Sequence, residues 1–209
     1  PDADGQTMTL TGITLPGLPN LVVGSNRKVA WGFTNGYCDN LDLVSLRRDP
    51  GDPLRFQTAR GWETAEVHRE IVQVAGQADR VLEVLETSLG PLRLIGEDAY
   101  AVRWIAHEPF AVDLRMIGLE TATSVEEALQ VAMAAGLPAQ NILVADHRGD
   151  IGWTIAGPLP DRPATFDTTA PLTLGGEPLW YGRLPVARYP RLLNPPSGQL
   201  WSANNRQLQ

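Results

Sequence analysis

The sequence predicts an α+β fold in which helices lie on stacked antiparallel β-sheets. Short apolar runs separated by turn residues fill residues 8–105, which is typical of antiparallel strands. A helical pattern replaces them over residues 113–136, and strand-like runs return after it. Strands, then helices, then strands again indicate segregated layers rather than alternating βαβ units. The sequence does not say how many layers there are.

The first half of the chain reads as a series of hairpins. Residues 8–15 alternate in part and predict an edge strand, and residues 21–23 and 29–33 predict buried strands joined by a turn. Clusters of glycine, proline and aspartate mark the turns between later runs. Further strands are expected over residues 43–46, 62–74, 81–85 and 100–105.

A capping box marks the start of the main helix. Ser124 stands three residues before Glu127, so the serine can cap the helix while the glutamate reaches back. Leu129 and Met133 continue at helical spacing, and Gly136 ends the helix. This apolar stripe predicts core packing.

Two more strands and a loop are expected beyond the helix. Residues 141–146 and 151–156 predict a hairpin closed by a tight turn at residues 147–150. The segment before the helix, residues 113–120, is also expected to be helical. Residues 163–185 are rich in proline, glycine and threonine and read as irregular loop.

Length and charge bound the possible functions. The 209 residues, 43% of them hydrophobic, suffice for one domain over residues 1–209. A net charge of −7 argues against nucleic acid and anionic membrane as main partners. The sequence has no run of about 18 apolar residues, so it predicts no transmembrane helix. The polar, acidic start without methionine resembles no signal peptide, so we expect a piece cut from a longer protein.

The stretch from Gly24 to Leu43 is the most informative part of the chain. Gly32 and Gly36 flank the polar pair Thr34-Asn35. We expect the strand to break at both glycines, which permit a positive φ or a close approach to a ligand. Such a bend can aim a backbone N–H at one point, as an oxyanion hole requires. Bends of this kind are also common between ordinary strands.

Two acidic residues and the single cysteine follow this bend. Asp39 and Asp42, with the backbone carbonyl of Leu41 between them, offer the hard oxygen donors that Ca²⁺ prefers. The same two residues could equally lie solvated in a loop. Cys38 cannot form an internal disulfide. No histidine stands near it in sequence, so we favour a small buried hydrophobe over a nucleophile.

Several pieces of the sequence resemble the β-subunit of the penicillin acylase (penicillin amidase) family, and further matching pieces follow downstream in the same order. The first pieces are Pro16-Gly17-Leu18-Pro19, Gly24-Ser25-Asn26, Ala30-Trp31-Gly32-Phe33-Thr34-Asn35 and Asp39-Asn40-Leu41-Asp42. The resemblance implies an incomplete αββα fold of the N-terminal-nucleophile hydrolase type. It also implies that residues 1–209 are one fragment of such a β-subunit, taking part in hydrolysis of linear amide bonds in N-acyl substrates.

The resemblance assigns two catalytic residues. The backbone N–H of Asn35 and the side-chain amide of Asn204, in the motif Ala203-Asn204-Asn205, would stabilise the oxyanion. A neutral amide can do this without titrating. The implied acyl pocket includes positions that could equally be ordinary core or scaffold. These are Val23, Phe33, Gln140 and Asn141.

The resemblance also implies a partial, structural Ca²⁺ site. Its ligands here would be Asp39, the carbonyl of Leu41 and Asp42, with a further oxygen near Asp167-Thr168. Other carboxylates would come from outside this chain. Because Ca²⁺ takes six to eight oxygen ligands, this chain alone is expected to bind the ion weakly.

The nucleophile of the family is a serine at the N-terminus of the mature β-subunit, released by autocatalytic cleavage of a zymogen. Residue 1 here is proline, so we expect the nucleophile to lie outside this chain and the chain alone to have no turnover. The implied partners are the α-subunit of the same precursor, the missing β-subunit segments and a small N-acyl amide substrate. The implied location is periplasmic or secreted, and the implied biology includes antibiotic biosynthesis.

Two alternatives stay open from the sequence. The chain could be a non-catalytic, β-rich binding module in which Asp39 and Asp42 hold a structural metal ion. It could also be a hydrolase that uses Cys38, which would require an exposed thiol beside a histidine.

Overall fold

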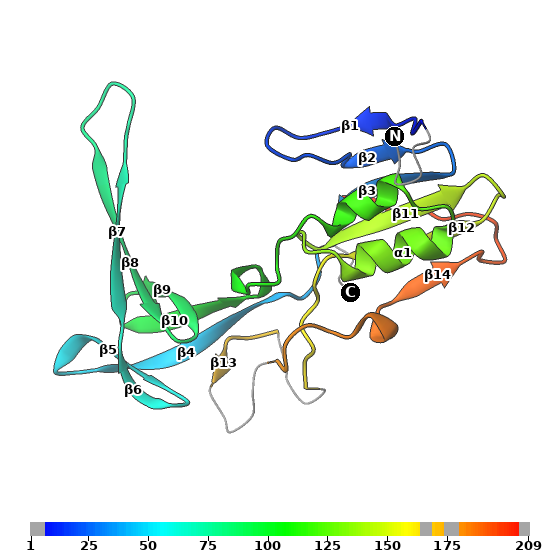
Figure 1. Cartoon of the computed structure of the whole chain (residues 1–209). Coiled ribbons are helices and arrows are strands. Elements are labelled where there is room, and N and C mark those ends of the chain that lie inside the picture. Colours follow the sequence, from blue (N-terminus) through cyan, green and yellow to red (C-terminus); the bar gives the residue numbers. More distant parts are fainter. Residues whose placement is uncertain (1–6, 164–168, 174–179, 205–209) are drawn as a thin grey trace. The chain divides into compact units, whose positions relative to one another are not determined.

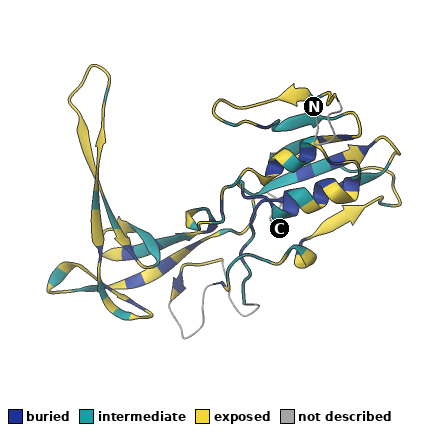
Figure 2. Cartoon of the chain, viewed as in Figure 1, coloured by how far each residue is buried: buried dark blue, intermediate teal, exposed yellow. Residues whose placement is uncertain are grey.

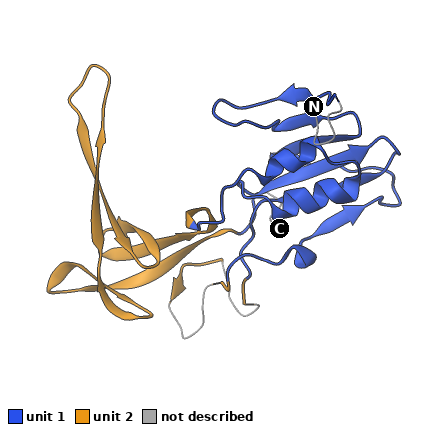
Figure 3. Ribbon diagram, viewed as in Figure 1, with its two compact units in different colours: residues 1–39, 108–161, 182–209 blue, residues 40–107, 162–181 orange. Residues whose placement is uncertain are grey.

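A computed structural model describes residues 7–163, 169–173 and 180–204 (Figure 1). The chain forms two compact units (Figure 3). Unit 1 comprises residues 1–39, 108–161 and 182–209, and unit 2 comprises residues 40–107 and 162–181. Each unit has its own hydrophobic core.

Unit 1 is built on a six-stranded sheet in which every neighbouring pair is antiparallel. Its order along the sheet is β1 (Thr11–Ile13), β2 (Val23–Ser25), β3 (Val29–Asn35), β11 (Gln140–Asp146), β12 (Ile151–Ala156) and β14 (Arg191–Leu193). The central pair, β3 and β11, joins segments more than 100 residues apart in sequence, with Gln140 opposite Asn35 and Asp146 opposite Val29.

Helix α1 (Val125–Ala134) covers one face of this sheet. Its residues Val125, Leu129 and Met133 are buried together with Ile142 of β11 (Figure 2). A Cβ on Gly152 would lie 2.5 Å from Val125 Cγ1, so glycine permits the close approach of helix and strand.

The predicted helix cap is present, but the glutamate reaches back to Thr123, one residue before the N-cap Ser124, rather than to Ser124 itself. The Glu127 N–H donates to Ser124 Oγ at 3.2 Å, and the Glu127 carboxylate accepts from the N–H of Thr123 at 2.7 Å. The segment before the helix is a 3₁₀ helix, η2 (Arg115–Glu120), rather than a second α-helix. A further 3₁₀ turn, η3 (Val186–Arg188), precedes β14.

Unit 2 is a second antiparallel sheet made mostly of consecutive hairpins. Its strands are β4 (Leu41–Asp49), β5 (Asp52–Thr58), β6 (Gly61–Thr64), β7 (Glu66–Val72), β8 (Arg80–Thr87), β9 (Gly90–Ile95) and β10 (Asp98–Trp104), followed by the 3₁₀ turn η1 (Ile105–His107). Its core gathers Val44, Phe56 and Ala101. Strand β13 (Leu172–Thr173) pairs with β4 in parallel, although residues 163–185 were expected to be loop throughout. Leu172 is buried in this core, which explains why two residues of a polar segment become a strand.

The expected break at Gly32 is wrong. Strand β3 runs through Gly32, which pairs with Leu143, and neither Gly32 nor Gly36 has a positive φ. Gly36 follows the strand end, where an added Cβ would lie 2.9 Å from the carbonyl oxygen of Ala139. That glycine therefore permits a close approach of two backbone segments, while cross-strand pairing keeps Gly32 extended.

No helix in the described part of the chain is long and apolar enough to cross a membrane.

Candidate active site

The end of strand β3 and the C-terminal segment meet at two hydrogen bonds. The backbone N–H of Asn35 donates to Asn204 Oδ1 at 2.8 Å. Next to it, Thr34 Oγ1 donates to Ser202 Oγ at 2.9 Å. The fold therefore brings together Asn35 and Asn204, which the sequence separates by 169 residues. Asn205, the second amide of the predicted motif, lies outside the described residues.

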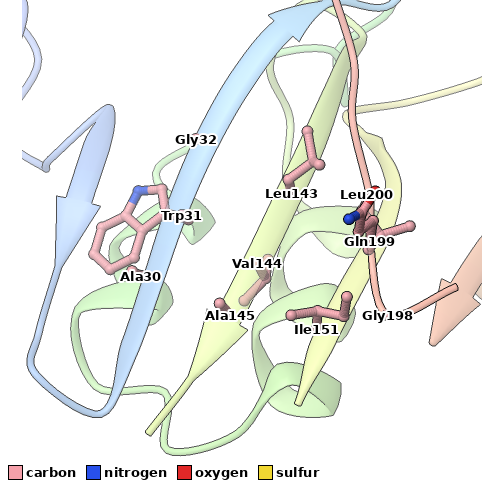
Figure 4. Close-up of a pocket in the computed structure, with 10 residues that line it drawn as sticks. All are labelled: Ala30, Trp31, Gly32, Leu143, Val144, Ala145, Ile151, Gly198, Gln199 and Leu200. Carbon is pink, nitrogen blue, oxygen red and sulfur yellow. The ribbon is translucent and has the colours of Figure 1, made fainter. Parts of the chain in front are cut away.

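The segment that carries Asn204 crosses the sheet face opposite helix α1. Gly198, Gln199 and Leu200 lie in front of β11 and β12 (Figure 4) and line a groove of about 500 Å³ together with residues of β3, β11 and β12. The sheet residues facing this groove are small or apolar and include Ala30, Gly32, Leu143, Ala145 and Ile151. This face of the sheet thus differs from the other face, which the helix covers.

The side chain of Asn141 contacts the residues around the oxyanion donor. Its Nδ2 donates to the carbonyl oxygen of Asn35 at 2.9 Å and lies 3.2 Å from Thr34 Oγ1. Its Oδ1 accepts from Trp153 Nε1 at 3.0 Å. Gln140 lies directly opposite Asn35 in the register of β3 and β11. Both residues therefore lie beside the end of β3, and the side chain of Asn141 is bonded to protein groups. Their role in an acyl pocket stays a prediction.

A small apolar cavity lies at the same end of β3. It measures about 160 Å³, and Phe33 lines it together with Val22, Met116 and Leu137. Val23, the other predicted pocket residue, is not among the lining residues; it sits in β2 opposite Ile13. The alternation of side chains along a strand explains why Val22 and its neighbour Val23 differ in this way.

The three predicted calcium ligands do not share one environment. Asp39 and Leu41 are exposed, whereas the Asp42 side chain is only 2% exposed and its Oδ2 lies 2.6 Å from Arg162 Nη1. The Arg162 guanidinium in turn stacks on the Trp180 ring at 5.5 Å. A guanidinium already neutralises Asp42, and a second cation at the same oxygen would be repelled.

The described residues hold no cluster of three or more histidine, cysteine or acidic side chains that could bind a metal. The further ligand expected near Asp167-Thr168 lies outside them. By themselves the described residues do not fit a Ca²⁺ site, and calcium binding stays a prediction that depends on ligands from elsewhere in the protein.

The environment of Cys38 does not favour a nucleophile. Burial and the nearby Asp39 raise the pKa of the thiol above its usual value. The thiol Sγ lies 3.6 Å from the carbonyl oxygen of Gly36. Within unit 1, His147 faces the Lys28 carbonyl beyond the opposite end of β3. A thiol with a raised pKa is a poor nucleophile.

Sequence reasoning missed the charged cluster at the far end of β11. The Asp146 side chain is fully buried and accepts from Arg148 Nη2 at 3.0 Å. It also accepts from the backbone N–H groups of Val125, Arg148 and Asp150. Burial opposes ionisation, but these donors prevail and lower the pKa of Asp146 to about 2. The available signal was an aspartate at a strand end just before a tight turn.

The penicillin amidase family model matches residues 2–209 of this chain. The chain belongs to the penicillin amidase family. Among curated members, the penicillin acylase 2 proenzyme of Pseudomonas sp. (strain SE83) is 30% identical over 207 residues, covering 94% of this chain and 26% of the relative. The acyl-homoserine lactone acylase QuiP of Pseudomonas aeruginosa is 28% identical over 215 residues, covering 95% of this chain and 25% of the relative.

A solved member of the penicillin amidase family supports the fold. The thermostable penicillin G acylase from Alcaligenes faecalis matches with a TM-score of 0.82 and 28% identity, over 96% of this chain and 37% of that one. The α+β fold with antiparallel sheets is thereby confirmed as the N-terminal-nucleophile hydrolase type. The chain spans about a quarter of the length of these curated relatives.

Proposed function

We propose that this chain supplies the oxyanion-binding part of an amidohydrolase that cleaves the amide bond of N-acyl substrates. The single observation that supports this is the meeting of the Asn35 N–H and the Asn204 carboxamide at 2.8 Å. These are the two groups that the family resemblance assigns to the oxyanion, and the fold places them within hydrogen-bond reach of each other.

The Asn35 N–H is aimed at an oxygen atom, here Oδ1 of Asn204. In the proposed reaction the substrate oxygen takes that position, and rotation of the Asn204 carboxamide turns its Nδ2 toward the same point. Two neutral donors then converge on the oxygen as it becomes negative. Neither donor titrates, so their contribution does not depend on pH near neutrality.

The nucleophile in this proposal is an N-terminal serine that another part of the full protein provides. Its hydroxyl oxygen attacks the amide carbon, and its own α-amine accepts the proton. Asn35 and Asn204 stabilise the resulting tetrahedral oxyanion. When the intermediate collapses, the C–N bond breaks, the amine leaves with a proton and an acyl-enzyme forms. Water then releases the carboxylic acid.

The apolar cavity beside Phe33 is the proposed site for the acyl side chain. Phe33 and Asn35 alternate with Thr34, so their side chains lie on the same face of β3. A dry apolar cavity of about 150 Å³ can hold a benzene ring. The cavity of about 160 Å³ therefore suits a single ring or a short aliphatic chain.

The full-length protein is the sample for the test, assayed with phenylacetyl- and fatty-acyl-amide chromogens. We expect hydrolysis, and we expect Asn204→Ala to lower kcat by about 10²–10³-fold. Asn194→Gly is the matched control, because Asn194 is also a C-terminal asparagine whose side chain bonds to the sheet, at Ile151 and Asp150. It should lower stability and leave kcat unchanged.

The alternative functions give different results in the same assay. A binding module would show no turnover of any amide with the wild-type protein, which would overturn the proposal. A hydrolase that uses Cys38 would lose activity on treatment with iodoacetamide at neutral pH, whereas a serine amidase with the buried thiol described above should keep it.

A further inference from the structure

We propose that Trp153 and Asn141 are positioning residues for the oxyanion hole, which they hold in place through Thr34 and the C-terminal segment. The inference rests on the proposed function and extends it to two residues that do not touch the substrate. Its basis is a chain of side-chain hydrogen bonds on the sheet face opposite helix α1.

Three adjacent strands contribute to this chain. Asn141 of β11 lies directly opposite Thr34 of β3 and directly opposite Ile155 of β12. Trp153 is two residues from Ile155, so its side chain is on the same face as that of Asn141. Thr34 and Asn141 are thus direct cross-strand neighbours, and Trp153, which pairs with Leu143, is the diagonal neighbour of Asn141, so the three polar side chains form an oblique row across the sheet.

Chemistry fixes the direction of the bonds that Asn141 makes in this row. The indole Nε1–H can only donate, so the atom of Asn141 facing Trp153 at 3.0 Å must be its oxygen. The Asn141 amide nitrogen must then face β3, where it donates to the Asn35 carbonyl at 2.9 Å and to Thr34 Oγ1 at 3.2 Å. Thr34 Oγ1 in turn donates to Ser202 Oγ at 2.9 Å.

The row ends at the two proposed oxyanion donors. Asn141 holds the peptide that follows Asn35, so it restrains the residue whose N–H is the first donor. Thr34 holds Ser202, two residues before Asn204, the second donor. A single amide side chain therefore influences both donors, and Trp153 sets the orientation of that amide. Errors of about 1 Å in such a geometry can cost roughly 10² in rate.

The test uses two variants of the full-length protein. Asn141→Leu removes all three bonds at similar volume, and Trp153→Phe removes only the indole donor and keeps an aromatic ring. We expect kcat to fall by about 10²-fold in the first variant and by about tenfold in the second. KM should change by no more than about twofold, because these residues act on the transition state.

Thr154→Val is the matched control. Thr154 neighbours Trp153 on β12, points to the helix-covered face and donates one buried hydrogen bond, to the Pro190 carbonyl at 2.7 Å. Like the test variants, Thr154→Val loses a side-chain hydrogen bond, but on the sheet face opposite to that of Asn141. Its stability should fall while kcat stays at the wild-type value.

Two readouts separate positioning from a general loss of structure. A boronic acid carrying the acyl side chain of the best substrate mimics the tetrahedral oxyanion, whereas the carboxylic acid product does not. Asn141→Leu should weaken binding of the boronic acid about as much as it lowers kcat/KM, with product binding unchanged. In an Asn204→Ala background the same substitution should cost less than in the wild type, because only its effect through Asn35 remains.

The outcomes distinguish the two proposals. An Asn204→Ala variant with wild-type kcat would overturn the oxyanion role itself. If Asn204→Ala is slow but Asn141→Leu and Trp153→Phe are as fast as wild type, only the positioning role is overturned. Equal losses for Asn141→Leu with and without Asn204 would overturn the proposed effect of Asn141 on Asn204. Should Asn141→Leu fail to fold, the milder Trp153→Phe decides between these results.

Discussion

Strand β11 carries a polar cluster at each end, and the two clusters differ in charge. At its last residue, Asp146 is a buried carboxylate bonded to Arg148 and to three backbone N–H groups. At its first two residues, Gln140 and Asn141 lie beside Thr34 and Asn35 of β3. All four of these side chains are uncharged.

The difference shows how one strand can serve stability at one end and chemistry at the other. The donors around Asp146 are all directed at a carboxylate charge that the protein itself provides. Their hydrogen bonds join helix α1 to the β11–β12 turn. The amides around Asn35 carry no charge. They are suited to an oxygen that becomes negative only during reaction, and a permanent carboxylate there would repel it.

The strongest test of this comparison is to bring a charge to the neutral end. Asn204→Asp keeps an acceptor for the Asn35 N–H but removes the donor and adds a negative charge. We expect kcat in the full-length protein to fall by about 10³-fold or more, beyond the loss in Asn204→Ala. Steady-state kinetics and a thermal melt check this. A near-normal melting temperature with normal kcat would show that the contact is purely structural.

The reverse change removes the charge from the charged end. Asp146→Asn should destabilise the protein by about 2 kcal/mol at pH 7, because hydrogen bonds to a buried charge are lost. The folded pKa of about 2 lies below the unfolded value of about 3.9, so this stabilisation is present above pH 5 and disappears as pH falls from about 4 to 2. Urea denaturation of wild type and variant across pH 2–7 measures it, and a pH-independent difference would contradict it.

A third change probes the close contact beside the neutral cluster. Gly36→Ala places a Cβ 2.9 Å from the Ala139 carbonyl and 3.0 Å from Cys38 Sγ. We expect a loss of about 1–3 kcal/mol in the free energy of unfolding. Gly32→Ala is the control, since nothing lies within 4 Å of its added Cβ. Equal stabilities of the two variants in urea titrations would argue against the contact at Gly36.

The smallest expected effect is at the helix start that Asp146 supports. Ser124→Ala removes the acceptor for the Glu127 N–H and should cost about 1 kcal/mol. Ser124→Asn retains a capping oxygen and should lie close to wild type. Thermal denaturation of both variants gives the comparison, and kcat should not change in either, because the cap lies at the end of the sheet away from Asn35.

Local patterns in the sequence determined much of the secondary structure. The alternation over residues 141–156 predicted the β11–β12 hairpin, and the spacing of Ser124 and Glu127 predicted the start of α1, because both depend on near neighbours. The glycine-flanked pair Thr34-Asn35 pointed to a backbone donor in that stretch, and likeness to a family then assigned the role to Asn35 and Asn204 before their contact was visible.

Only the tertiary structure decided which distant groups meet and what they do for one another. The pairing of β3 with β11 keeps Gly32 extended, turns Asn141 toward Asn35 and places Asp146 beneath a helix that begins 21 residues before it in sequence. Arg162 reaches Asp42 across 120 residues in the same way. The sequence supplies the hydrogen-bonding groups, but their partners follow from strand register, which is set by contacts far apart along the chain.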